Sequence, residues 1–248
     1  MPNNSLVFGL HAVKALLERH PDRVTQLYLL AGRQDEKLRA FLVLAQSLDI
    51  PMQTVSREKL DQLSEHANHQ GIVATCEAHA LLKENDLPTL LAHLTEPPFL
   101  LILDGVQDPH NLGACLRTAD AAGVHAVIAP KDRSVGVTPT VRKVASGAAE
   151  RVPFIAVTNL VRTMEWLKEQ GVWLYGATEE AEESLHRAKL IGPIAIVMGA
   201  EGAGLRHLTK THCDVLVHIP MLGSVASLNV SVATGVVLFE TVRQRSTR

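Results

Sequence analysis

Aromatic side chains are scarce in this sequence: phenylalanine, tryptophan and tyrosine make up 4% of its 248 residues. Many proteins that bind single-stranded nucleic acid stack the bases on aromatic side chains, so we do not expect stacking as the main mode of binding here. Positive charge is not in excess either, because the formal net charge is -2. Bulk charge therefore does not favour nucleic-acid binding. Any such site must be a local basic patch, or one that two chains build together.

Long apolar runs and clustered cysteines are also missing. No stretch reaches the roughly 18 consecutive apolar residues of a membrane span, and the opening MPNNSLVFGL lacks the basic start and long apolar core of a signal peptide. Cys76, Cys115 and Cys213 form no Cys-x-x-Cys pair, so they predict neither a zinc cluster nor a disulfide framework. We expect a reduced, cytoplasmic protein without a metal site or a membrane segment.

The beginning of the chain predicts a small α/β domain over residues 1–78. Apolar periodicity predicts strands at 6–8, 25–30, 52–55 and 71–78 and helices at 11–20, 35–48 and 57–65. Ser56 stands where the cap of the last of these helices is expected. The polar stretch 79–98, with a short helix after Asp86 and the pair Pro97–Pro98, predicts a linker.

Residues 99–248 predict a second, larger α/β domain. The continuous apolar run FLLILDG at 99–105 is typical of a strand buried on both faces of a parallel sheet. Strands and helices then alternate with short connections, which indicates an open parallel sheet with helices on both faces. The strands are expected at 125–130, 152–158, 172–178, 193–199 and 215–220, and the helices at 111–123, 140–149, 160–171 and 228–243.

Three loops of this domain carry candidate site residues, because ligands of such sheets bind beyond the carboxyl ends of the strands. In the first, 103–123, Asp108 and Pro109 open a helix, and Asn111 stands six residues before Arg117. The alternative is that Asn111 only caps the helix and Arg117 lies on the surface, as most helical arginines do.

The second loop, IVMGAEGAGL at 196–205, looks at first like a nucleotide-binding turn. Gly199, Gly202 and Gly204 give G-x-x-G-x-G, which reverses the dinucleotide spacing G-x-G-x-x-G. Glu201 lies among them, where it would repel a phosphate. The pattern therefore argues against a pyrophosphate site.

The third loop lies within 219–240 and places Ser227, Asn229 and Ser231 at the head of an otherwise apolar helix. Three hydrogen-bonding side chains exceed what an N-cap needs, which favours a functional site. The alternative is a serine cap with two incidental polar residues.

In order and in detail, DGVQDPHNLGACLRTADAAG, IVMGAEGAGL and IPMLGSVASLNVSVATGVVLFE resemble the three motifs of the SpoU family of RNA 2'-O-methyltransferases, over about residues 99–243. Residues 5–77 resemble the small RNA-binding domain, similar to ribosomal protein L30, that precedes the catalytic domain in some members. FGLHAVKALLE and HQGIVA are typical of that branch. The resemblance extends to the bacterial enzymes that methylate a guanosine ribose of 23S rRNA in the P-site loop of the peptidyl-transferase centre.

This resemblance implies a fold, a cofactor and partners. Family members bind S-adenosylmethionine in a deep trefoil knot, here about residues 194–235, and work as homodimers on RNA, here 23S rRNA. The cofactor contacts that it implies are Gly199, Ile219 and Leu228. S-adenosylmethionine carries a sulfonium cation and no phosphate, so Glu201 is compatible with it.

The resemblance also implies catalytic residues. It places Arg117 nearest to the methyl transfer. Because a guanidinium stays protonated in proteins, we expect Arg117 to clamp a phosphate beside the target ribose and to orient the hydroxyl; action as a base is a hypothesis for the family. Asn111 is expected to position Arg117 or the ribose. Glu201, Ser227 and Asn229 are expected to order the site, with Asn229 as a second hydrogen-bonding partner of the nucleotide.

A candidate basic patch for RNA comprises Lys131, Arg133, Arg142 and Lys143. Charges at this density are also common on a solvated face. Their segment, KDRSVGVTPTVRKV, departs most from the pattern of the family.

Four alternatives stay open. A SpoU-type tRNA 2'-O-methyltransferase would share the motifs. An NAD-dependent oxidoreductase would need a dinucleotide fingerprint, which DGVQDPHNLG lacks. A cysteine hydrolase would use Cys115 with His110 or His125, although a lone helical cysteine is more often a small core residue. A non-catalytic RNA-binding protein would lose the motif side chains, all of which are present.

Overall fold

The computed structural model describes residues 4–32, 36–64, 66, 68–77, 82–225 and 227–246. The chain divides into two compact units. Unit 1 comprises residues 1–80 and 137–151, and unit 2 comprises 81–136 and 152–248.

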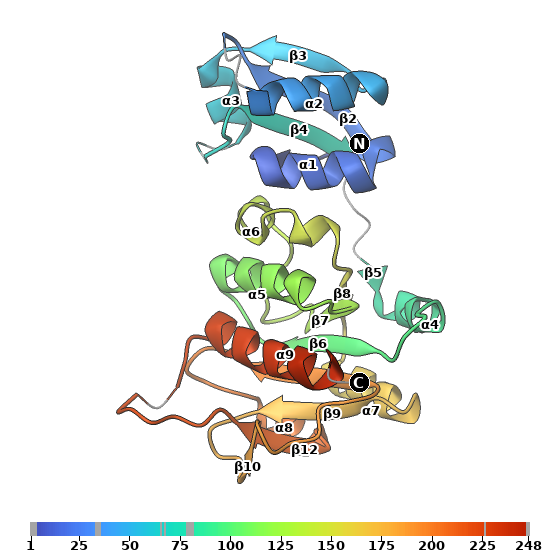
Figure 1. Ribbon diagram of the computed structural model, residues 1–248, viewed down its shortest axis with the longest axis vertical. Helices are drawn as coiled ribbons and strands as arrows, with labels where there is room; N and C mark the ends of the chain where they lie inside the picture. Colours follow the sequence, from blue (N-terminus) through green and yellow to red (C-terminus); the bar gives the residue numbers. More distant parts are fainter. Residues whose placement is uncertain are drawn as a thin grey trace. The chain divides into compact units, whose positions relative to one another are not determined.

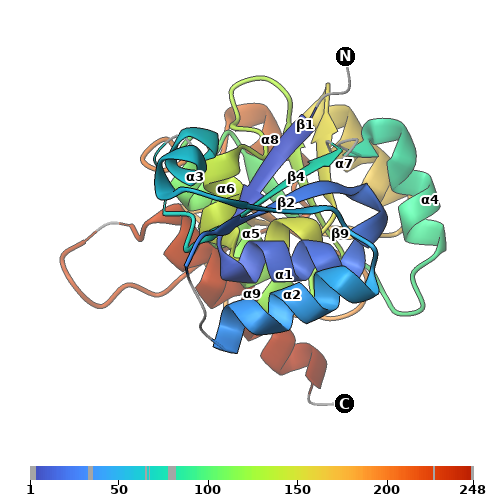
Figure 2. The same ribbon diagram turned by 90° about the horizontal axis from the view of Figure 1, so that it is seen from above.

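Unit 1 is built on a four-stranded sheet of order β1-β4-β2-β3, in which β2 and β3 are parallel and the other pairs antiparallel. Helices α1 and α2 lie side by side (Figure 2). The strands are β1 (Asn4–Phe8), β2 (Val24–Leu30), β3 (Met52–Val55) and β4 (Ile72–Glu77), and the helices are α1 (Leu10–Arg19), η1 (Pro21–Arg23), α2 (Glu36–Ser47), α3 (Arg57–Leu63), α6 (Pro139–Ala145) and η3 (Ala148–Glu150).

Alternating side chains of this sheet pack on opposite faces, as the period of two in a strand requires. Leu27 and Leu29 belong to the core under α1 and α2, whereas Phe8 and Val73 pack with Leu60 of α3. The strands and helices expected within 1–78 are confirmed over the described residues, and positions 35, 65 and 78 at their ends lie outside that part of the chain. Ser56 caps α3 by accepting the backbone N–H of Lys59.

The helix expected over 140–149 was too long, because α6 ends at Ala145. Ser146 and Gly147 have φ angles of 52° and 89°, and two successive left-handed residues cannot continue a right-handed helix. A Cβ on Gly147 would also lie 2.7 Å from the Cβ of Ala15. The last residues of the expected helix form η3 instead.

Unit 2 contains an eight-stranded sheet of order β10-β12-β9-β11-β6-β7-β8-β5, and every neighbouring pair is parallel. The expected parallel α/β fold is confirmed. Its strands are β5 (Leu82–Lys83), β6 (Phe99–Asp104), β7 (Ala126–Pro130), β8 (Phe154–Val157), β9 (Trp173–Ala177), β10 (Glu183–Ser184), β11 (Ile194–Gly199) and β12 (Val215–His218). Its helices are η2 (Glu84–Asp86), α4 (Leu87–Ala92), α5 (Pro109–Ala121), α7 (Leu160–Glu169), α8 (His207–His212) and α9 (Val230–Ser246).

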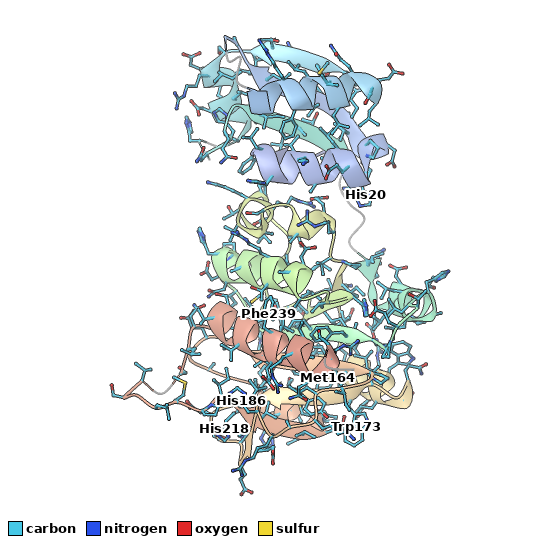
Figure 3. The ribbon with its side chains drawn as sticks, in the orientation of Figure 1. His20, Met164, Trp173, His186, His218 and Phe239 are labelled. Carbon is cyan, nitrogen blue, oxygen red and sulfur yellow. The ribbon has the colours of Figure 1, made fainter. Side chains whose placement is uncertain are left out.

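Helices cover both faces of this sheet (Figure 1). Every residue of β6 and β11 is buried, which explains why these strands read as continuous apolar runs. Leu100 and Ile102 pack with Met164 of α7 on one face, and Met164 points inward in Figure 3. On the other face α9 packs against α5 and β11.

Two short segments of unit 2 were not expected as strands. β5 pairs with β8 and is followed by α4 within the stretch 79–98, and β10 pairs with β12. Both strands have only two residues, too few for a periodic signal. Among the described residues, every helix is too short or too polar to cross a membrane.

Candidate active site

Two of the three loops start side by side because of the sheet register. The last residues of β6 and β11, Asp104 and Gly199, are paired neighbours in adjacent parallel strands. The loops at 105–108 and 200–206 therefore leave the same edge of the sheet, where ligands of such folds bind.

In the first loop the cap of α5 is Asp108, whose side chain accepts the backbone N–H of His110 at 2.9 Å, and Pro109 follows at the first helical position. Asn111 is therefore not the N-cap, and its side chain is available for another role. It is 8% exposed, which requires that its amide finds partners.

Those partners come from the other two loops. The Nδ2 of Asn111 donates to Oε2 of Glu201 at 2.9 Å. The Nδ2 of Asn229 donates to Oδ1 of Asn111 at 3.0 Å and to Oε2 of Glu201 at 3.3 Å. One residue from each of three distant segments thus meets in a single hydrogen-bonded triad, Asn111, Glu201 and Asn229.

The orientation of the Asn229 amide is set by the helix that follows it. Its Oδ1 accepts the backbone N–H of Ser231 at 2.9 Å and the Ser231 hydroxyl at 2.6 Å, at the first turn of α9. With the oxygen engaged there, the NH₂ group must face Asn111 and Glu201. Asn229 therefore links the start of α9 to the triad.

Beside the triad lies a cavity of about 520 Å³. It opens at the carboxyl ends of β9, β11 and β12, and the beginning of α9 completes its wall. The predicted cofactor contacts Gly199, Ile219 and Leu228 all line it, as do Glu201 and Ser227. Its size falls within the range of small-molecule sites.

Gly199 and Gly204 of the second loop are each favoured for a different physical reason. A Cβ on Gly199 would lie 2.1 Å from the carbonyl carbon of Gly204 and 2.3 Å from the nitrogen of Leu205, so only glycine lets the loop fold back on itself. The fold-back is held by paired backbone hydrogen bonds between Ala200 and Gly204, of 2.9 and 3.1 Å. Gly204 has a φ of 63°, which favours glycine.

Sequence reasoning missed the ion pair that anchors this loop. Asp104 is 1% exposed and accepts the backbone N–H of Arg206 at 3.0 Å and its Nε at 2.6 Å; the Nη2 of Arg206 also contacts it. Asp104 is the one charged residue in the apolar run FLLILDG. That isolated charge was the available signal, because a buried carboxylate needs a partner.

The cavity suits a ligand that is part apolar and carries positive charge. Ile219, Pro220 and Leu228 supply apolar surface, which a flat base can contact. The buried Nδ1 of His218, at the end of β12 (Figure 3), has no hydrogen-bond partner among the described residues, which leaves one bond for a ligand. Carboxylates also outnumber cations in the lining, so a sulfonium nucleoside fits and a pyrophosphate does not.

Arg117 and Ser227 lie outside the triad. Arg117 is exposed on α5 and makes no hydrogen bond or ion pair with any described residue. Asn111, which we expected to position Arg117 or the ribose, contacts Glu201 and Asn229. Ser227 is exposed at the cavity. The structure thus brings together three of the five predicted catalytic residues.

The expected basic patch is incomplete, because Arg142 does not present its charge to solvent. Arg142 is 6% exposed and contacts Glu150, itself 4% exposed; burial lowers the pKa of Arg142. Spacing along the chain could not distinguish this buried pair from a solvated cation. Lys131, Arg133 and Lys143 are exposed.

The cysteine-hydrolase alternative is wrong. Cys115 is fully buried, burial raises the pKa of its thiol to about 11, and the thiol donates to the Thr234 hydroxyl at 3.6 Å. A nucleophilic cysteine needs an accessible thiolate. The Nδ1 of His125 is engaged as well, since it accepts the backbone N–H of Phe99 at 3.0 Å.

Known proteins are similar to this chain in both sequence and fold. The SpoU rRNA methylase family matches residues 98–239, and the family "RNA 2'-O ribose methyltransferase substrate binding" matches residues 6–82. The 23S rRNA (guanosine-2'-O-)-methyltransferase RlmB of Photorhabdus laumondii is 57% identical over 243 residues, 98% of this chain and 99% of that protein. The protein of the same name from Shewanella oneidensis is 58% identical over 245 residues, 99% of each chain.

A solved structure agrees with these matches. The SpoU methyltransferase AviRb from Streptomyces viridochromogenes, in complex with the cofactor AdoMet, superposes with a TM-score of 0.83 at 25% identity, covering 99% of this chain and 92% of that one. The matched family covers more than half of the chain, and the relatives cover nearly all of it. The chain belongs to the SpoU rRNA methylase family.

Proposed function

We propose that this protein transfers the methyl group of S-adenosylmethionine to the ribose 2'-hydroxyl of a guanosine in 23S rRNA. One observation carries the proposal: Asn111, Glu201 and Asn229, from three separate motifs, meet beside a cavity lined by Gly199 and Leu228. The names of the relatives from Photorhabdus and Shewanella support the same reaction and substrate.

The cofactor is held by the cavity, with Gly199, Ile219 and Leu228 as its contacts. Gly199 offers backbone without a side chain, and the other two offer apolar surface. When bound, S-adenosylmethionine supplies a methyl group on a positively charged sulfur. The family likeness to a structure solved in complex with AdoMet supports this assignment.

The remaining side chains act on the RNA. Arg117 clamps the phosphate beside the target ribose and orients its hydroxyl, because a guanidinium binds phosphate through two parallel hydrogen bonds. Its lack of a protein partner among the described residues leaves those donors for the RNA. The triad orders the loops around the cavity, and Ser227 offers its hydroxyl as a hydrogen-bonding group at the edge of the cavity. The proton of the ribose 2'-hydroxyl leaves to solvent.

We infer an L30-like RNA-binding domain over 1–78, a linker over 79–98 and the methyltransferase domain over 99–248, with a trefoil knot over about 194–235. The match of residues 6–82 to a substrate-binding family supports an RNA role for the first domain. The guanosine lies in the P-site loop of the peptidyl-transferase centre, and the protein works in the cytoplasm.

We also infer a homodimer. Four large apolar side chains on α9 and the loop before it are exposed, Leu222 at 101%, Val225 at 60%, Val232 at 53% and Phe239 at 49%. Phe239 projects from α9 in Figure 3. Val232 and Phe239 lie seven residues apart, on one face of α9, and an exposed apolar face is typical of an interaction surface.

The direct test is methyl transfer to RNA. The purified protein is incubated with S-adenosylmethionine carrying a labelled methyl group and with an unmodified 23S rRNA transcript, and any 2'-O-methyl is mapped by primer extension. A tRNA transcript serves as the second substrate. We expect one labelled guanosine in 23S rRNA and none in tRNA.

Two results would contradict the proposal. Absence of transfer to rRNA under conditions in which the cofactor binds would remove the assigned reaction. Transfer to tRNA in place of rRNA would keep the reaction and replace the substrate.

A further inference from the structure

The charges that line the cavity are unbalanced. Glu179, Glu180 and Glu201 supply three carboxylates, and Lys210 supplies one ammonium. Glu180 and Lys210 contact each other, and the hydrogen bond from Lys210 lowers the pKa of Glu180. Because this ion pair is neutral as a unit, Glu179 and Glu201 leave the cavity with negative charge.

Glu201 is held in a way that fixes its position without cancelling its charge. Its Oε2 accepts two hydrogen bonds, from the amides of Asn111 and Asn229, and both donors are neutral. Within the described ranges no lysine, arginine or histidine pairs with it. The two amides therefore hold the carboxylate of Glu201 in one position at the cavity wall.

We propose that Glu201 makes this cavity bind S-adenosylmethionine in preference to S-adenosylhomocysteine, the neutral product of the methyl transfer. The inference rests on the proposed function. The two ligands differ by one methyl group and one unit of positive charge, and a nearby carboxylate attracts only the charged one. Once the methyl group has left, the attraction is gone, so the product dissociates more readily than the methyl donor.

The test is the ratio of two dissociation constants, measured by calorimetry without RNA. In Glu201→Gln the side-chain oxygen still accepts from the two amides, whereas the charge is removed. We expect weaker binding of S-adenosylmethionine with little change for S-adenosylhomocysteine, so that the preference falls by roughly three- to tenfold, as for one charge in a solvent-accessible site.

A matched control lies in the same cavity. The double variant Glu180→Gln with Lys210→Gln removes one charge of each sign and should leave the preference unchanged. Sinefungin, which carries an amine where S-adenosylmethionine has its methylated sulfur, is the second ligand control. It keeps the cation, so its affinity should fall in Glu201→Gln as that of S-adenosylmethionine does.

A measurement on the unaltered protein is independent of how any variant folds. Salt screens charges over a distance of about 10 Å at 0.1 M, so the preference for S-adenosylmethionine should decline as sodium chloride is added. Equal losses of affinity for both ligands in Glu201→Gln would overturn the proposal. So would a preference for S-adenosylmethionine that changes neither in this variant nor with added salt. If the unaltered protein bound neither ligand, the proposed function itself would be contradicted.

Discussion

Among single residues, Asn229 shows most directly how helix formation and site geometry are coupled. Its side-chain oxygen accepts a hydrogen bond at the start of α9, and its side-chain NH₂ group donates to the triad. Each interaction therefore orients the group that makes the other. A serine or aspartate could cap the helix equally well. Neither has an NH₂ group to donate to Glu201 and Asn111, which explains why an amide is suited to this position.

Arg117 is the residue whose loss should separate catalysis from binding. We expect Arg117→Ala to lower methyl transfer by about a hundredfold, as when a transition-state donor is removed, and to leave the affinity for S-adenosylmethionine and the melting temperature unchanged. The reason is that Arg117 is exposed and makes no bond within the described part of the protein. Single-turnover kinetics with rRNA, calorimetry and thermal unfolding give the three readings.

Two further variants sharpen this prediction. Arg117→Lys keeps the charge and loses the planar fork, so it should recover only part of the activity. Arg187, another exposed arginine outside the three motifs, is the control, and Arg187→Ala should transfer methyl groups normally. Full activity of Arg117→Ala would remove the assigned role.

Removal of Arg206 should lower the free energy of unfolding more than removal of the Asp104 charge, its partner in the ion pair. Arg206→Ala leaves a carboxylate that is 1% exposed without its cation, which should reduce the free energy of unfolding by about 3 kcal/mol. Asp104→Asn leaves a guanidinium that is 44% exposed and can be hydrated, so the loss should be nearer about 1 kcal/mol. Urea denaturation measures both, and equal losses would contradict this account.

The turn from Gly199 to Gly204, between β11 and α8, offers a matched comparison of two glycines. Gly199→Ala forces a Cβ into the backbone of Gly204, so the turn must open and the affinity for S-adenosylmethionine should fall by about tenfold or more. Gly202 has a φ of 75° and no atom within 4 Å of its would-be Cβ, so Gly202→Ala should cost only about 1 kcal/mol of backbone strain. Calorimetry and urea denaturation separate the two. Similar behaviour of both variants would refute the steric explanation.

Most elements could be predicted because their signals are local. The apolar runs of β6 and β11 and the amphipathic spacing of α7 lie within a few residues of one another, and they place the site at the carboxyl edge of the sheet. The end of α6 could not be predicted, because it depends on the left-handed backbone of Ser146 and on the contact of Gly147 with Ala15, far away in the sequence.

The site was predictable to a similar extent. The polar residues of the three motifs were recognisable in the sequence, but the bonds among Asn111, Glu201 and Asn229 depend on strand register and on helix capping, which only the folded chain defines. For Arg142 the sequence was misleading, because the basic stretch predicted an exposed charge and gave no sign of its burial against Glu150.

For the molecule as a whole, the chain does not follow domain boundaries in simple order. Residues 137–151 leave the sheet of unit 2 and belong to unit 1, where Glu150 pairs with Arg142 and with Arg23, at 3.5 Å from the latter. Unit 1 therefore contains a segment that lies beyond the proposed linker in the sequence. Sequence position alone could not reveal this, because Arg23 and Glu150 lie 127 positions apart.

The exposed face of α9 gives the prediction for the whole assembly. Burying Phe239 and Val232 against a second copy should contribute about 1.5–3 kcal/mol for each side chain, whereas a charge there would be left unpaired in an apolar contact. We expect Val232→Glu with Phe239→Glu to convert a dimer into a monomer without unfolding, since both side chains are about half exposed in the single chain. Sedimentation velocity measures the mass, and circular dichroism checks the fold.

Val43, 66% exposed on α2, provides the control, because Val43→Glu adds the same charge to an apolar surface position of unit 1 and should leave the dimer intact. A monomeric parent protein, or a double variant that stays dimeric, would show that this face is not the interface.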